Sequence, residues 1–267
     1  MTYMNKNGSL KNGYNAYIDS SVDDMGTQMD IGLLLMEDGD TYTIEEPEKE
    51  TAVLLFAGKV TYQWGGETVE ADRPDCFHHD AYCLLAPRRT RIVLTAHGHS
   101  ELYIQKTVND KDYEAVMYSP DKVQVEHKGF GGELMGCMSR EIKTFFDLDN
   151  APFSKMVLGE VLNLPGKWSS YPPHHHPQPE VYFYRFDYPD GFGAGFANGE
   201  IFKTEHNGCA VINHGFHSQT AAPGYAMCYA WGIRHLDGDP WDKTRIDDPE
   251  HAWLWKADAN DHIYPNH

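Results

Sequence analysis

A repeated pattern across the two halves of the chain constrains its fold more than any other feature. At a constant offset of 127 residues, short apolar runs in the first half meet similar runs in the second half. The matched segments are 53–56 with 180–183, 83–87 with 210–214, and 102–104 with 229–231. Such a repeat indicates that one structural unit occurs twice in the chain.

The runs themselves have the length and alternation of β-strands. Apolar residues rarely recur at helical spacing, whereas short runs bounded by Gly, Pro, Asn or Asp are common. We expect turns at Gly58 and at Gly65 and Gly66, and weak helices over 111–118 and 250–255. The expected strands are 30–36, 51–56, 59–64, 82–85, 91–95 and 101–105, followed in the second half by 156–163, 180–186, 193–197, 209–213 and 226–233.

Two copies of a small all-β unit predict two tandem jelly-roll barrels of the cupin type, an arrangement called a bicupin. We expect an N-terminal barrel over residues 1–125 and a C-terminal barrel over residues 126–267. The division falls at the polar, glycine-rich run 127–132 (HKGFGG), which has the composition of a linker.

Composition bounds the surroundings and partners of the chain. Of its 267 residues, 41% are hydrophobic and 23% are charged, as in globular domains, and the formal net charge is −18. This charge disfavours nucleic acid and anionic membranes as partners. The five cysteines are widely spaced without a C-x-x-C motif, which predicts reduced thiols. Without a long apolar run or a secretory signal, the sequence predicts a cytoplasmic location.

The second half carries a constellation of metal-ligand residues. The segment 171–180 (YPPHHHPQPE) places His174 and His176 ahead of Glu180, and the segment 208–217 (GCAVINHGFH) ends in His217. Alternation along a strand puts His174 and His176 on one face and the intervening histidine on the other. Three imidazoles and a carboxylate suit Zn²⁺, Mn²⁺, Fe²⁺ or Ni²⁺. We predict one divalent metal per chain, with zinc as the expected ion; a solvated histidine loop is the structural alternative.

The repeat supplies an internal control for this prediction. At the same offset, the first half has Pro47, Lys49, Val53 and Thr90 in place of the four ligands. None of these residues offers the donor set that such a metal needs. The N-terminal barrel is therefore predicted to be metal-free and to serve packing or assembly, which makes a homo-oligomer an expectation.

Several longer strings show a resemblance to a known family. The segments are 167–174 (KWSSYPPH), 180–186 (EVYFYRF), 215–217 (GFH), 221–225 (AAPGY) and, in the first half, 50–59 (ETAVLLFAGK). Together they resemble the 5-deoxyglucuronate isomerase family of myo-inositol catabolism, over nearly the whole chain. The resemblance implies a bicupin that interconverts 5-deoxy-D-glucuronate and 5-dehydro-2-deoxy-D-gluconate, with the metal on His174, His176, Glu180 and His217.

An aldose–ketose shift of this kind needs a proton removed beside a carbonyl and returned to the neighbouring carbon. A divalent metal would hold the developing negative charge, and the protein must supply a proton acceptor. The catalytic candidates are Glu160, Tyr182 and Tyr229, with Tyr184 as a further phenol; Glu160 is the first choice among them. For each tyrosine the structural alternative is ordinary aromatic packing.

The substrate is expected to be a small sugar acid, whose carboxylate calls for a cation. Arg185, Arg234 and His235 lie near the motifs, but alternation turns Arg185 away from Glu180, and the role stays unassigned. Three alternative functions share the same ligands: a uronate ketol-isomerase of pectin breakdown, an oxygen-activating dioxygenase, and a sugar-binding or storage bicupin without turnover.

Overall fold

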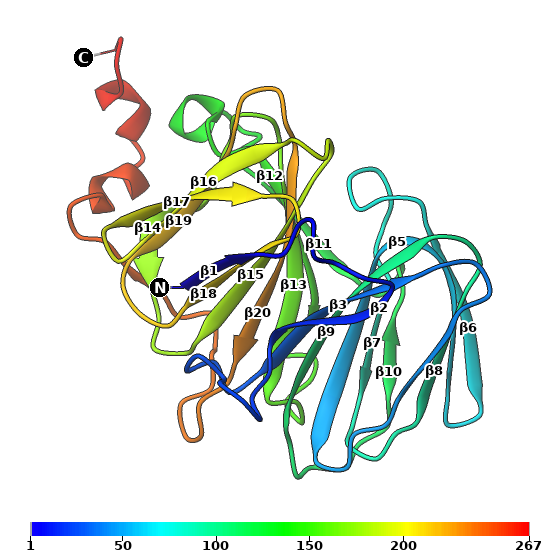
Figure 1. Cartoon of the computed structure of the whole chain (residues 1–267). Coiled ribbons are helices and arrows are strands. Elements are labelled where there is room, and N and C mark those ends of the chain that lie inside the picture. Colours follow the sequence, from blue (N-terminus) through cyan, green and yellow to red (C-terminus); the bar gives the residue numbers. More distant parts are fainter. Residues whose placement is uncertain (1, 267) are drawn as a thin grey trace.

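The computed structural model describes residues 2–266, and its regular structure is almost entirely β (Figure 1). The strands form three sheets, and their pairs are antiparallel. No α-helix occurs between residues 2 and 266, where the helical segments are the 3-10 turns η1 (Glu133–Gly136), η2 (Ala252–Trp255) and η3 (Ala259–His262). None of these turns has the length and apolar character needed to cross a bilayer.

The first half of the chain builds a nine-stranded sheet. Its main path runs β10 (Val116–Tyr118), β7 (Cys83–Ala86), β5 (Lys49–Trp64), β9 (Ser100–Val108), β3 (Asp30–Met36) and β2 (Gly13–Ile18). Three more strands, β4 (Thr41–Ile44), β6 (Glu67–Arg73) and β8 (Ile92–Ala96), extend it around the second part of β5. Apart from β1, the blue to blue-green ribbons of Figure 1 trace this sheet.

The second half builds two further sheets. The seven-stranded sheet runs β1 (Thr2–Asn5), β18 (Gly208–Ile212), β15 (Glu180–Phe186), β20 (Met227–Arg234), β13 (Met156–Asn163), β12 (Arg140–Phe146) and β11 (Gln124–Lys128). The five-stranded sheet runs β17 (Glu200–Glu205), β16 (Phe192–Ala197), β19 (His217–Ala221), β14 (Trp168–His175) and β21 (Ile246–Asp247). The strand β1 thus brings the start of the chain into a sheet made by its second half (Figure 1).

The seven-stranded sheet is the middle layer, with an apolar core on each face. On β15, Val181 and Phe183 face the nine-stranded sheet, where Phe183 stacks on Phe56 with ring centroids 5.8 Å apart. Tyr182 and Tyr184, which alternate with them, face the five-stranded sheet. Each aromatic pair adds about 0.5–1.5 kcal/mol to the stability of the fold beyond the contribution of its buried area. A continuous apolar interface therefore joins the two halves.

The structure corrects the expected turn at Gly58. The ranges 51–56 and 59–64 belong to one long strand, β5, and Gly58 lies within it at φ +110°. A Cβ there would lie 2.6 Å from the carbonyl oxygen of His99, so only glycine fits this close approach. A register shift between Leu55 and Ala57 lets the strand change direction while its pairing continues.

Of the remaining expectations for secondary structure, a turn and three strands are confirmed and one helix is wrong. Gly65 and Gly66 form the predicted turn, and the ranges 30–36, 156–163 and 180–186 coincide with β3, β13 and β15. The expected helix over 111–118 is wrong, because its last three residues pair with β7 as a strand. The segment 250–255 contains a single 3-10 turn. Within residues 2–266 each sheet has free edges, so none closes into a barrel by hydrogen bonds alone.

Candidate metal centre

The three predicted histidines come together between the seven-stranded and five-stranded sheets. His174 is the penultimate residue of β14 and the direct register partner of His217, the first residue of β19. His176 follows β14 and completes a group whose ligand nitrogens all lie within 4.8 Å of one another. His175 points to the opposite side, where its ring contacts Phe216 at 5.0 Å. The strand alternation assumed from the sequence therefore holds here.

The fourth predicted ligand, Glu180, begins β15 and lies beside the triad. Its Oε2 is 3.3 Å from Nε2 of His176 and 3.3 Å from Nε2 of His217. The carboxyl is buried, which would raise its pKa, but the two imidazoles beside it hold the pKa of Glu180 below its usual value. The group is thus a carboxylate, the form in which it binds a metal.

Several imidazole nitrogens at this site lack hydrogen-bond partners. Both nitrogens of His217 and Nδ1 of His174 are buried without one, which costs free energy unless another group pairs with them. Nδ1 of His176 lies 2.9 Å from the carbonyl oxygen of Gln178, and this contact turns Nε2 toward the triad. Burial lowers the pKa of His174 well below its usual value, which leaves the imidazole neutral. Together with one carboxylate, these imidazole nitrogens without hydrogen-bond partners form a ligand set that fits a divalent metal.

A cavity of about 240 Å³ opens beside the triad. One face of the seven-stranded sheet lines it, with alternate residues of each strand pointing inward. These residues are Gln124, Glu126 and Lys128 of β11, Arg140, Ile142 and Thr144 of β12, Val161 of β13, Glu180 and Tyr182 of β15, and Tyr229, Trp231 and Ile233 of β20. The cavity thus combines metal-ligand residues, phenols and cations within one chamber, which suits a small polar molecule.

Two of the predicted catalytic residues lie in this cavity. Tyr182 donates a hydrogen bond to Oε2 of Glu180 at 3.0 Å, and its ring packs against Tyr229 at 5.1 Å. The hydroxyl of Tyr229 donates to Ser169 at 2.9 Å. Burial raises the pKa of Tyr229 to about 12 and that of Tyr182 well above its usual value. Both phenols are therefore protonated at neutral pH and act as donors.

The third candidate, Glu160, does not reach the cavity, which corrects its assignment as the proton acceptor. It alternates with Val161 on β13 and so faces the nine-stranded sheet, where both carboxylate oxygens accept hydrogen bonds from Arg73. Lys143 lies 3.7 Å from the same carboxylate. Glu160 is thus the buried anion of an ion-pair network between the two halves of the chain.

The cations named from the sequence also lie outside the cavity. Arg185 faces away from Glu180, as strand alternation predicts, and pairs with Glu101. Arg234 donates a hydrogen bond to Thr107. His235 accepts a hydrogen bond from the backbone of Trp241. The cation that does line the cavity beside Tyr229 is Arg140, which carries no sequence motif and lies on a strand 34 residues before His174.

The residues of the first half that match the ligands in the repeat gather no such group. Among residues 2–266, His174, His176 and His217 form the one cluster of three or more ligand side chains with converging atoms. The region around Pro47, Lys49 and Val53 instead belongs to β5 and its approach, with Val53 in the core.

A layered, almost entirely β fold carries the histidine triad between two of its sheets, and the chain shares this fold with known proteins. Comparison with solved structures agrees: an IolB-like protein from Salmonella typhimurium LT2 superposes with a TM-score of 0.81 at 19% identity, covering 92% of this chain and 97% of that one. Oxalate decarboxylase from Lactobacillus farciminis superposes at 0.63 with 8% identity, over 87% and 85% of the two chains. These likenesses concern the fold.

The family follows from the sequence as a whole. The model of the KduI/IolB family matches residues 3–254, and the chain belongs to this family. A 5-deoxy-glucuronate isomerase from Geobacillus thermodenitrificans is 24% identical over 237 residues, 82% of this chain and 83% of that protein. The 5-deoxy-glucuronate isomerase of Bacillus subtilis strain 168 is 22% identical over 250 residues, 85% and 88% of the two chains. The resemblance inferred from short motifs is confirmed.

Proposed function

We propose that this chain is a metal-dependent aldose–ketose isomerase that converts 5-deoxy-D-glucuronate to 5-dehydro-2-deoxy-D-gluconate in myo-inositol catabolism. The observation that carries the proposal is the converging group of His174, His176 and His217 beside Glu180, in a polar cavity of a KduI/IolB family member. Relatives named 5-deoxy-glucuronate isomerase match more than four fifths of the chain, which favours this substrate.

The four side chains would hold one divalent ion, for which zinc is our first choice because it commonly takes histidine and carboxylate ligands. When bound, such an ion supplies Lewis-acid polarisation of a substrate carbonyl. Manganese, iron and nickel suit the same donors.

Side chains of the cavity would then donate hydrogen bonds to the oxygens of the sugar. Tyr182 and Tyr229 are buried, protonated phenols on the cavity wall, so they would donate hydrogen bonds to substrate oxygens as negative charge develops on them. Trp231 and Trp241 line the same cavity and add apolar surface to it. Glu160 has no part in this step, because Arg73 holds it on the far side of β13.

The test compares two neighbouring histidines that lie on opposite sides of β14. The metal content of purified wild type, His174→Ala and His175→Ala is measured, and NMR follows the conversion of 5-deoxyglucuronate. We expect about one metal per chain and conversion in wild type and His175→Ala, and neither in His174→Ala. Equal metal content and equal turnover in the two variants would refute the site, and metal without turnover in wild type would refute the substrate.

A second candidate is the uronate ketol-isomerase of pectin breakdown. The name of the family joins two members, KduI and IolB, which favours a comparison of their two substrates. This function would use the same ligands, and the NMR assay with the corresponding deoxy-uronate distinguishes it by the ratio of the two kcat/KM values.

The arrangement of the chain extends the proposal. We propose that residues 1–125 and 126–267 are two tandem cupin barrels, the first without a metal and the second with the catalytic site. The internal repeat and the separate apolar cores of the two halves support this view. A cytoplasmic location and assembly through the metal-free half complete the proposal, and size-exclusion chromatography with light scattering tests the assembly.

A further inference from the structure

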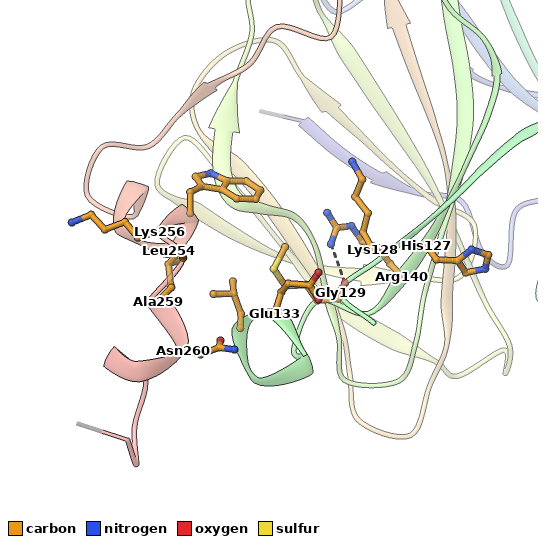
Figure 2. A pocket seen from close by; sticks show the side chains of 13 residues that line it. His127, Lys128, Gly129, Glu133, Arg140, Leu254, Lys256, Ala259 and Asn260 are labelled. Carbon is orange, nitrogen blue, oxygen red and sulfur yellow. Dashed lines mark hydrogen bonds between the residues drawn. The ribbon is translucent and has the colours of Figure 1, made fainter. Parts of the chain in front are cut away.

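A second cavity, of about 530 Å³, adjoins the metal cavity. Its walls are β11, the start of β12, η1 and the C-terminal segment that contains η2 and η3. Figure 2 shows Lys128 and Arg140 on the strand side, facing the segment that carries Leu254, Lys256 and Ala259. Lys128 and Arg140 are register partners, and both line the metal cavity as well, so the two chambers meet at these residues.

The cations of the metal cavity differ in whether a carboxylate pairs with them. Four Lys or Arg side chains line it, and three have an acidic partner: Lys128 with Glu126, Lys243 with Asp147 and Asp149, and Arg245 with Asp247. Among residues 2–266, no carboxylate lies within ion-pair distance of Arg140. Its charge is therefore the one available to an anion that enters the chamber.

Burial makes this lone charge costly. Arg140 is 5% exposed, and its hydrogen bond within the chain runs from Nη1 to the carbonyl oxygen of Met138 at 2.9 Å. A guanidinium remains charged in proteins, and removing one from water without a counter-ion costs several kcal/mol. Its planar fork of donors matches a carboxylate, which it binds through two parallel hydrogen bonds. The site is thus built for an anionic ligand.

The position of Arg140 fits the length of a sugar acid. Along the cavity wall, Glu180 contacts Tyr182 and the ring of Tyr182 contacts Tyr229, while Arg140 lies on β12, two strands beyond the strand β20 that carries Tyr229. The metal ligands and Arg140 therefore stand at opposite ends of a row of two phenols. A linear sugar acid has the same order of groups, with a carbonyl at one end, hydroxyls between and a carboxylate at the other.

We infer that Arg140 binds the carboxylate of the substrate and selects acidic sugars over neutral ones. The inference rests on the proposed isomerase function and names the group that orients its substrate. Arg140 fixes which end of the sugar reaches the histidines, and the cavity next to it leaves room for the carboxylate end to enter.

The test removes the charge and compares an acidic with a neutral substrate. Arg140→Met should raise KM for 5-deoxyglucuronate and lower kcat/KM by roughly 10- to 100-fold, as expected for the loss of a charged hydrogen-bonding partner. Its kcat/KM for 5-deoxyglucose, in which a hydroxymethyl group replaces the carboxylate, should equal that of wild type. Arg140→Lys should recover part of the affinity for the acid. The matched control, Lys203→Met, removes a paired charge from β17, outside both cavities, and should change KM less than about threefold.

Thermal unfolding and metal analysis of each variant exclude a loss of fold, since Arg140 also donates to Met138. An unchanged KM for the acid in Arg140→Met, or an equal loss with both sugars, would overturn the assignment. Calorimetric titration with D-gluconate separates it from the proposed reaction: if wild type isomerises neither sugar, the reaction is wrong. Binding of gluconate that Arg140→Met loses would still support the anion site, and absent or equal binding would overturn it.

Discussion

His174 and His217 face each other as register partners on β14 and β19, with ring centroids 4.5 Å apart. Buried nitrogens of these two imidazoles find no hydrogen-bond partner in the described chain, which is a cost to the folded state. A bound metal would make up for this deficit and join the strands.

Removal of metal should therefore destabilise the wild type. At metal concentrations of 100 to 1,000 times Kd, binding adds about 3–4 kcal/mol to the free energy of unfolding. We expect EDTA to lower Tm by several degrees in thermal unfolding followed by circular dichroism. His217→Ala should unfold at the same temperature with and without EDTA, and an EDTA effect of the same size in that variant would argue against the site.

Glu160→Gln should unfold more easily while its metal content stays normal. The substitution leaves the buried guanidinium of Arg73 without its anion, a change that costs about 3–5 kcal/mol. Urea unfolding and metal analysis of the same samples test both parts. The control, Glu205→Gln, removes a carboxylate from an exposed pair with Lys203 and should cost less than about 1 kcal/mol. Metal loss with unchanged stability in Glu160→Gln would return this residue to the site.

Acid should destabilise the chain in part through His206. Burial, with Arg185 beside it, lowers the pKa of His206 to about 4, against about 6.5 in an unfolded chain, while Glu101 acts weakly in the other direction. Between these values the unfolded state binds a proton that the folded state does not, so the free energy of unfolding falls as pH drops from 6.5 to 4. His206→Gln should reduce this loss by about 1–3 kcal/mol in urea unfolding at pH 7 and pH 4.5. A His206→Gln slope equal to that of wild type would contradict the shift.

The sequence revealed those parts of the site that depend on short-range spacing. His174, His176 and Glu180 lie within seven residues of one another, and strand alternation alone placed His175 and Arg185 on the outside. The same reasoning could not place Glu160. Strand alternation shows that Glu160 and Val161 point to opposite faces of β13, but it does not show which of these faces lines the cavity. That choice depends on the packing of the nine-stranded sheet.

Arg140 and the long strand β5 escaped prediction for a related reason. Arg140 enters the cavity because β12 pairs with β13, and no local pattern distinguishes it from the other surface-like arginines of the sequence. In β5 a glycine that usually marks a turn serves a close contact with His99 instead. Contacts between residues far apart in the chain decide both features, and a single sequence carries no direct record of them.

The pairing of β1 with β18 has a consequence for the order in which the chain can fold during its synthesis. Thr2 leaves the ribosome well before its partner Val211, which follows about 209 residues later. At roughly 5–20 residues per second, the first strand waits on the order of 10–40 s for the edge it joins. Until β18 is made, β1 therefore lacks the strand with which it pairs in the folded chain.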